Sequence, residues 1–227
     1  MRYLLSHFEK KSVQNAHVRI SNSRFTQNEV KKYYACDSRV IEPVIDTELF
    51  SPGSNEKARK QLHMDEEERP IILFVGNPVY SKGFDIFSRL AKAHPEYAFH
   101  AVCVPIPSPA PVNVHVHGPQ SSENVREFYR AADVLIFPSR YEGFGFVPLE
   151  ALACSCPVIA SRVGIFHDFE HSNARIIPHD FWAFEKAMIE AIEHPPQWDK
   201  DSDWAARFSP ELFAQNWKSV LGENNVF

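Results

Sequence analysis

Two glutamates, Glu142 and Glu150, bracket a glycine-bearing turn with seven residues between them. The surrounding pattern predicts that Glu142 lies in the turn and that Glu150 lies on the side of the helix that follows. One carboxylate can then face a sugar in a cleft, and the other can accept hydrogen bonds from vicinal hydroxyls such as those of a ribose. Two unconnected surface carboxylates are the alternative interpretation, and the pair alone does not separate the two.

Lys82 is the second residue that could do chemistry. It stands five residues after Asn77 and directly before Gly83, at a predicted junction between a strand and a helix. There an ammonium group can reach an anion held by backbone N–H groups, and the glycine lets the chain and a ligand come close. A surface lysine is the alternative, although the helix dipole disfavours a cation at a helix start. Lys82 therefore indicates an anion site.

Other chemistries have less support in the sequence. The chain contains neither G-x-x-x-x-G-K-[ST] nor G-x-G-x-x-G, which argues against a Walker loop and against a nicotinamide enzyme. His115 and His117 would share one strand face, but no third ligand has suitable spacing, so we expect no metal site. Cys154 and Cys156 are predicted to be packing thiols and not nucleophiles.

A parallel sheet would hold these residues in place, because apolar strands alternate with helices from residue 70 onward. The predicted strands cover residues 71–76, 97–104, 112–118, 134–137, 157–160 and 174–177, and the predicted helices cover 84–93, 123–132, 147–153 and 181–192. This alternation predicts an α/β fold with a Rossmann-like, doubly wound parallel sheet. Ligands of such sheets bind at the carboxyl ends of the strands, where Lys82 and the turn at Glu142 would lie.

The two ends of the chain do not follow this alternation. We expect little regular structure before residue 17 and a lone strand over 17–21 that needs a sheet supplied from elsewhere. The remaining expected elements are helices over 26–35 and 55–63, an extended linker over 39–45, a proline-stiffened connector over 105–111, and closing helices over 201–208 and 210–221.

Composition places the chain among globular proteins. It has 227 residues, of which 44% are hydrophobic and 23% charged, with a formal net charge of −5. The negative charge gives no support to a nucleic-acid partner. No apolar run approaches the ~20 residues of a membrane span, the first residues do not resemble a secretory signal, and the four cysteines lack zinc spacing. We expect a cytoplasmic protein, peripheral at a membrane if its substrate is lipid-linked.

Four stretches together resemble a known family. Residues 21–26 and 40–50 are similar to its crossing between two domains, residues 74–76 with 82–85 to its first donor-domain turn, and residues 129–134 with 142–158 to its two-glutamate signature. The chain resembles the C-terminal, donor-binding half of a retaining GT-B glycosyltransferase of the family 4 type, the glycosyl transferases group 1. The resemblance implies an N-terminal remnant and linker over 1–52, a nucleotide-sugar-binding Rossmann-like domain over 53–208, and a helix over 209–227 that packs back on the N-terminal domain.

The resemblance also implies roles for individual residues. Lys82 and the amides of the turn would hold the donor diphosphate, Glu150 the ribose and Glu142 the transferred sugar, with Glu142 and Lys82 as the catalytic pair. No metal or other cofactor would be needed, because Lys82 and oriented amides supply positive charge to the departing diphosphate. The implied donor-binding residues are Gly76, Asn77, Lys82, Gly83, Gly118, Glu142, Gly143, Phe144, Gly145, Phe146, Val147 and Glu150.

The chain departs from the family pattern in several places. Asn77 stands where an arginine is common, Ser155 where a glycine is usual, and Gly164-Ile165 where two glycines are usual. The acceptor-binding half is missing except for the remnant, so we expect a separate acceptor subunit or self-association through the lone strand and the last helix. The acceptor would be a saccharide, a lipid-linked compound or a small molecule. The alternatives are a non-catalytic nucleotide-sugar-binding or scaffolding subunit, and an epimerase of similar architecture whose acid–base residues we do not find.

Overall fold

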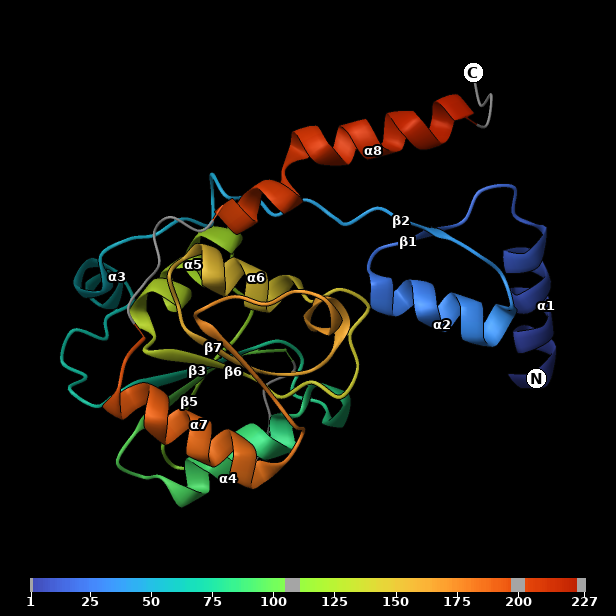
Figure 1. The fold of residues 1–227 in the computed structure, drawn as a ribbon. Helices are drawn as coiled ribbons and strands as arrows, with labels where there is room; N and C mark the ends of the chain where they lie inside the picture. Colours follow the sequence, from blue (N-terminus) through green and yellow to red (C-terminus); the bar gives the residue numbers. More distant parts are fainter. Residues whose placement is uncertain (1, 105–110, 197–202, 224–227) are drawn as a thin grey trace.

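A parallel sheet of six strands forms the centre of the protein (Figure 1). The computed structural model describes residues 2–104, 111–196 and 203–223. The strands are β3 (Ile71–Val75), β4 (Ala98–Val102), β5 (Val114–His117), β6 (Val134–Phe137), β7 (Val158–Ser161) and β8 (Ala174–Ile177). The predicted α/β class and Rossmann-like sheet are confirmed, and each predicted strand is present. The predicted proline-stiffened connector lies outside the described residues except at Pro111.

Helices cover both faces of this sheet, as Figure 1 shows. The helices α4 (Phe84–Ala93) and α7 (Phe181–Glu193) pack on one face, while α5 (Ser122–Ala131) and α6 (Phe146–Ala153) pack on the other, with α3 (Asn55–Gln61) beside α5. Alternate strand residues point to opposite faces, so Ile72 and Phe74 join the α4–α7 side whereas Ile71 and Leu73 join the α5–α6 side. Two buried apolar layers result.

The strand order places a switch point between β3 and β6. The sheet runs β5–β4–β3–β6–β7–β8, so the chain builds outward from β3 in one direction and then from β6 in the other. Leu73 of β3 pairs with Leu135 of β6. In sheets of this order the two crossover helices leave opposite faces at the switch point and open a crevice beyond the strand ends. The loops after β3 and β6 carry Lys82 and Glu142.

The N-terminal segment differs from the prediction. Residues Arg2–Asn15 form helix α1, although no regular element was expected before residue 17; the stretch contains neither glycine nor proline to interrupt a helix. The predicted lone strand is shorter, β1 (Ile20–Ser21), and it is not alone. It pairs in parallel with β2 (Arg39–Val40) across helix α2 (Arg24–Tyr34). The expectation of an unpaired strand was therefore wrong, because β2 supplies its hydrogen bonds.

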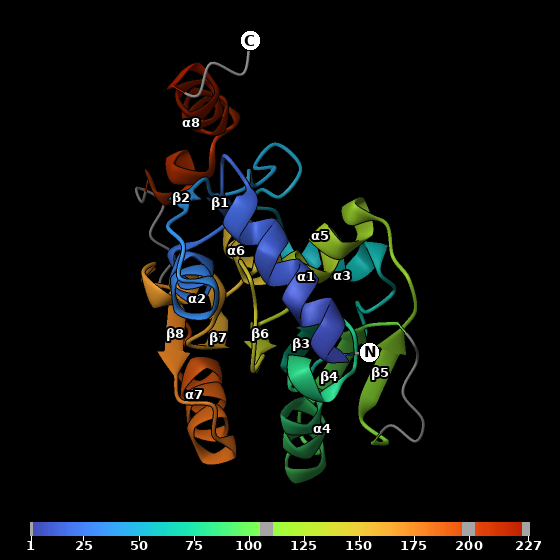
Figure 2. The same ribbon diagram turned by 90° about the vertical axis from the view of Figure 1, so that its right-hand side faces the viewer.

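The C-terminal segment leaves the sheet on its α5–α6 side. A 3₁₀ helix, η3 (Asp203–Phe208), precedes α8 (Pro210–Glu223), and both views show α8 projecting away from the sheet (Figures 1 and 2). Figure 2 also shows α4 and α7 side by side beneath the sheet, where they touch. Within the described residues, no helix combines the length and the apolarity that a bilayer crossing requires.

Candidate functional site

A pocket of about 320 Å³ opens at the switch point between β3 and β6. Its size lies within the range of small-molecule sites. Its floor is formed by the ends of these strands, and its walls are formed by the loops that follow them. The lining residues are Asn22, Phe74, Val75, Gly76, Lys82, Phe137, Ser139, Glu142, Gly143, Phe144, Gly145, Phe146 and Val147. Lys82 and Glu142, predicted from separate motifs, therefore share one pocket.

Lys82 and Glu142 are in direct contact. The Lys82 Nζ lies 2.6 Å from Glu142 Oε1, and the Ser139 hydroxyl donates to the same oxygen at 2.8 Å. The Glu142 side chain is 13% exposed and that of Lys82 is 34% exposed. One ammonium and one carboxylate thus meet at the mouth of the pocket, where each is still accessible to a ligand.

Backbone conformation fixes both loops at glycines. Gly83 has φ +73°, and a Cβ at this position would lie 1.9 Å from the carbonyl oxygen of Pro138, so the loop after β3 touches the loop after β6. Gly145, the N-cap of α6, has φ +109°. Only glycine adopts these conformations at little cost while leaving space for the neighbouring backbone. The two glycines therefore set where Lys82 and the start of α6 lie.

The start of α6 presents backbone donors to the pocket. The N–H groups of residues 143–147 donate to no acceptor in the part of the chain that the structure describes. The first N–H groups of a helix have no intrahelical partner, and the helix dipole adds partial positive charge at this end. Lys82 stands across the same pocket. Such a combination is suited to holding an anion, and the anion site at Lys82 stays a prediction.

Arg140 joins the two loops on the outside of the pocket. Its backbone N–H donates to Ser81 O at 2.9 Å, and its guanidinium binds both carboxylate oxygens of Asp85 at 2.7 and 2.8 Å. The guanidinium also lies 3.6 Å from the centre of the Tyr80 ring. Hydrogen bonds from Arg140 lower the pKa of Asp85 and keep the pair ionised. Neither of these two charged residues was singled out from the sequence.

Glu150 does not line the pocket. Its Oε2 accepts a hydrogen bond from the Tyr129 hydroxyl of α5 at 2.9 Å. Burial raises the pKa of Glu150, while the Tyr129 hydrogen bond partly opposes that rise. The predicted place on the side of α6 is confirmed. A contact between Glu150 and a ribose stays a prediction. For that contact to form, the Glu150 carboxylate must bind the ribose in addition to Tyr129 or in its place.

The other predicted donor residues fall into two groups. Phe144 is buried and Phe146 is 44% exposed, with the two rings in edge contact at 5.0 Å, so Phe144 packs the turn onto the core. Gly76 lines the pocket at φ +140°. Asn77 and Gly118 do not line it, and among the described residues no atom outside the chain neighbours of Gly118 lies within 4 Å of its Cβ position. A role for these two stays a prediction.

The lining contains residues that the sequence did not indicate as site residues. Ser139 is the second residue after β6, and its place just beyond a strand end is the signal that could have indicated it. Phe74, Val75 and Phe137 are strand residues whose backbone and rings form the floor. Asn22 comes from the N-terminal segment, 120 residues before Glu142, and no local pattern reveals that proximity.

Cys154 and Cys156 pack in the interior, as predicted, and three histidines stack on one another. His115 and His117 both stack on the buried His100, with ring centres 4.8 and 5.2 Å away. No group of three or more metal-ligating side chains occurs within residues 2–104, 111–196 and 203–223. Cys154 and Cys156 are buried free thiols, and burial raises the pKa of Cys154 to about 12. Neither thiol is a nucleophile at neutral pH.

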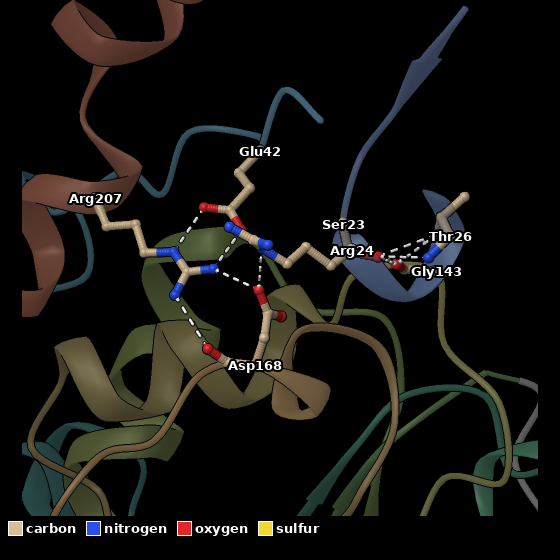
Figure 3. Close-up of polar contacts among 7 residues, drawn as sticks. All are labelled: Ser23, Arg24, Thr26, Glu42, Gly143, Asp168 and Arg207. Atoms are coloured by element: carbon tan, nitrogen blue, oxygen red, sulfur yellow. Dashed lines mark hydrogen bonds and ion pairs between the residues drawn. The ribbon is translucent and has the colours of Figure 1, made fainter. Parts of the chain in front are cut away.

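A second, larger hollow of about 590 Å³ lies between α2, the linker after β2 and α8. Figure 3 shows its charged wall, in which Arg207 binds Glu42 at 2.5 and 2.7 Å and Asp168 at 3.2 Å, with Arg24 also 3.2 Å from Asp168. The charges balance, and every one of these four side chains already has a partner. We therefore place the candidate site in the smaller pocket, which is lined by the backbone N–H groups at the start of α6 as well as by Lys82.

The sheet order defines a Rossmann-like α/β domain, and the amide-lined pocket lies at its switch point. A model of the family described as "Glycosyl transferases group 1" matches residues 69–194, which is more than half of the chain. The chain belongs to this family.

Relatives with names and solved structures agree with this assignment. The D-inositol 3-phosphate glycosyltransferase of Acidothermus cellulolyticus is 36% identical over 149 residues, covering 56% of this chain and 33% of its own length. The structure of sucrose-phosphate synthase (tll1590) from Thermosynechococcus elongatus matches with a TM-score of 0.81 and 25% identity, over 96% of this chain and 61% of that one. This chain therefore spans about a third of the curated relative.

A third protein shares the fold alone. Anabaena Alr3699/HepE in complex with UDP-glucose matches with a TM-score of 0.77 at 19% identity, over 96% of this chain and 69% of that one. The fold is thus that of the Rossmann-like domains of GT-B glycosyltransferases.

Proposed function

We propose that this chain binds the nucleoside-diphosphate sugar donor of a retaining glycosyltransferase and supplies the charges that release its diphosphate. The observation that carries the proposal is the pocket at the switch point, which is lined both by Lys82 and by residues 143–147, whose backbone N–H groups have no acceptor among the described residues. The named relatives are glycosyltransferases, and Alr3699/HepE has been solved with UDP-glucose. These names support the donor class; the sugar, the base and the acceptor are not part of the proposal.

Cleavage of the bond between the sugar and the diphosphate requires positive charge beside the departing, anionic diphosphate. The Lys82 ammonium and the amides at the start of α6 are held before substrate arrives, so they stabilise charge in the transition state without reorganising. Glu142 then accepts hydrogen bonds from the hydroxyls of the transferred sugar. Because lysine and amides supply this charge, we expect transfer to proceed without a bound metal. Acceptor binding is expected to require a further domain or subunit.

Calorimetry with uridine, guanosine and adenosine diphosphates tests donor binding, and Lys82→Met should weaken the best of the three by at least tenfold. Removal of a charge-assisted hydrogen bond to phosphate costs about 1.5–3 kcal/mol. Lys92→Met, on the far part of α4, is the matched control and should leave affinity unchanged. If no diphosphate binds the wild-type chain, the proposal is wrong.

A scaffolding subunit without catalysis is the second candidate, and the exposed Asn77 at a position where the family commonly carries arginine favours it. Both candidates bind the donor, so only turnover separates them. Donor hydrolysis or transfer that is lost in Glu142→Ala, with diphosphate affinity retained, would support the enzyme. NMR of the anomeric proton of the product would then test retention.

A further inference from the structure

We infer that residues 22–26 of the N-terminal segment are positioning residues for the anion-binding loop, holding the peptide between Gly143 and Phe144 in place. The inference rests on the proposed function for its ligand, but its contacts stand independently of it. The contact between Ser23 and Gly143 cannot be read from local sequence, because the two residues are 120 positions apart.

Two hydroxyl groups hold the Gly143 carbonyl. Ser23 Oγ donates to Gly143 O at 2.6 Å, and Thr26 Oγ1 lies 3.0 Å from the same oxygen (Figure 3). The Thr26 Oγ1 also lies 2.8 Å from Asn22 Oδ1. Ser23 is fully buried, so its bond is shielded from water. Asn22 itself lines the pocket. The wall of the pocket is thus built from the N-terminal segment as well as from the loops after β3 and β6.

The geometry of a trans peptide connects this carbonyl to the ligand side. The C=O and N–H of one peptide plane point in opposite directions, so fixing Gly143 O also fixes the N–H of Phe144, which points away from the two hydroxyls. Hydroxyls that donate to the carbonyl also polarise the peptide and strengthen its N–H as a donor. Ser23 and Thr26 therefore set the direction and the strength of one amide that lines the pocket.

Aromatic contacts brace the same loop from its other side. The Phe25 ring stacks on His167 at 4.6 Å and meets the edge of Tyr141 at 5.6 Å. His167 ends the 3₁₀ helix η2 (Gly164–His167), whose Ile165 N–H donates to Phe144 O at 2.7 Å. Both carbonyls that flank Phe144 are therefore held, one by the N-terminal segment and one by η2.

The first experiment needs no ligand. Amide hydrogen exchange reports the Ile165 N–H, and we expect Ser23→Ala and Thr26→Val each to raise its exchange rate about tenfold, the effect of losing one buried hydrogen bond. Ser23 also caps α2, so Ser54→Ala, which removes the equivalent cap of α3 away from the site, is the matched control and should leave Ile165 unchanged.

The second experiment measures binding of uridine, guanosine and adenosine diphosphates by calorimetry. Thr26→Val should weaken the best diphosphate about tenfold, and Thr26→Ser, which restores the hydroxyl, should bring affinity back to within about twofold of the wild type. The inference is overturned if the exchange rate of the Ile165 N–H is unchanged in both Ser23→Ala and Thr26→Val. It is also overturned if that rate rises while the affinity for diphosphate stays unchanged. A wild-type chain that binds no diphosphate overturns the proposed function, and the exchange data then decide the positioning role alone.

Discussion

Lowering the pH from 7 to 5 should destabilise this protein through one buried imidazole. His100 of β4 is 4% exposed, and its Nδ1 lies 3.0 Å from Nε2 of His117. Burial lowers the pKa of His100 to about 3, helped by His117, His115 and Arg69, while Glu67 opposes the shift. The imidazole is therefore neutral in the folded protein at pH 5.

The unfolded chain behaves differently at the same pH. An exposed imidazole has a pKa near 6.5, so it is about 97% protonated at pH 5. Because the folded pKa lies below the unfolded one, the unfolded state binds more protons, and stability falls as the pH drops from 6.5 toward 3. With a folded pKa of about 3, the free energy of unfolding should fall by about 2 kcal/mol between pH 7 and pH 5 from this residue alone. Glu67, whose pKa hydrogen bonds from Arg69 lower to about 2, stays ionised throughout this window.

Urea unfolding followed by tryptophan fluorescence at pH 7 and pH 5 measures the effect. His100→Phe, which keeps an aromatic ring against His115, should lose about 2 kcal/mol less than the wild type on acidification. His94 is a control of opposite sign: burial lowers its pKa, but hydrogen bonds with Glu96 and Glu185 outweigh this and raise it. His94→Gln should therefore lose more stability than the wild type at pH 5. Equal losses in the wild type and His100→Phe would refute the reasoning.

Three further predictions concern the backbone and the loops. Ser155 has φ +65° and a buried Oγ with no hydrogen-bond partner among the described residues, so Ser155→Gly should raise the free energy of unfolding by about 1 kcal/mol; a lower urea midpoint would contradict this. Gly83→Ala would place Cβ against Pro138 and should cost more than about 2 kcal/mol, whereas Gly118→Ala, with open space around it, should cost less than about 1 kcal/mol in the same melts. Arg140→Lys breaks the paired hydrogen bonds with Asp85 and should weaken diphosphate binding severalfold in calorimetry. The free energy of unfolding should fall by no more than about 1 kcal/mol. Unchanged affinity would argue against a role for this contact in placing the loops.

Much of the central fold could be predicted from the sequence. Runs such as residues 71–75 and 134–137 are apolar throughout, which is typical of strands buried on both faces, and the helices between them begin near capping residues such as Ser121 and Asp180. The same alternation placed Lys82 and Glu142 at strand ends. It could not show that their side chains lie 2.6 Å apart, because that distance depends on β3 and β6 being neighbours.

Two contacts that the sequence did not reveal involve partners distant in the chain. The strand at Ile20 was expected to lack a sheet, but the chain returns through α2 and Arg39 pairs beside it. Glu150 was placed correctly on its helix, yet a polar partner was available in Tyr129 of α5, and a buried carboxylate takes the nearest donor.

Local sequence by itself determined the elements of this protein and the two glycines that shape its loops, because backbone conformation depends on nearest neighbours and on the apolar period along the chain. Only the tertiary structure decided which side chains meet at the pocket. Ser23 and Thr26 hold a carbonyl more than a hundred residues away, and Asn22 completes the wall. A polar group is satisfied by whatever donor or acceptor packing brings within reach, and packing is a property of the whole chain.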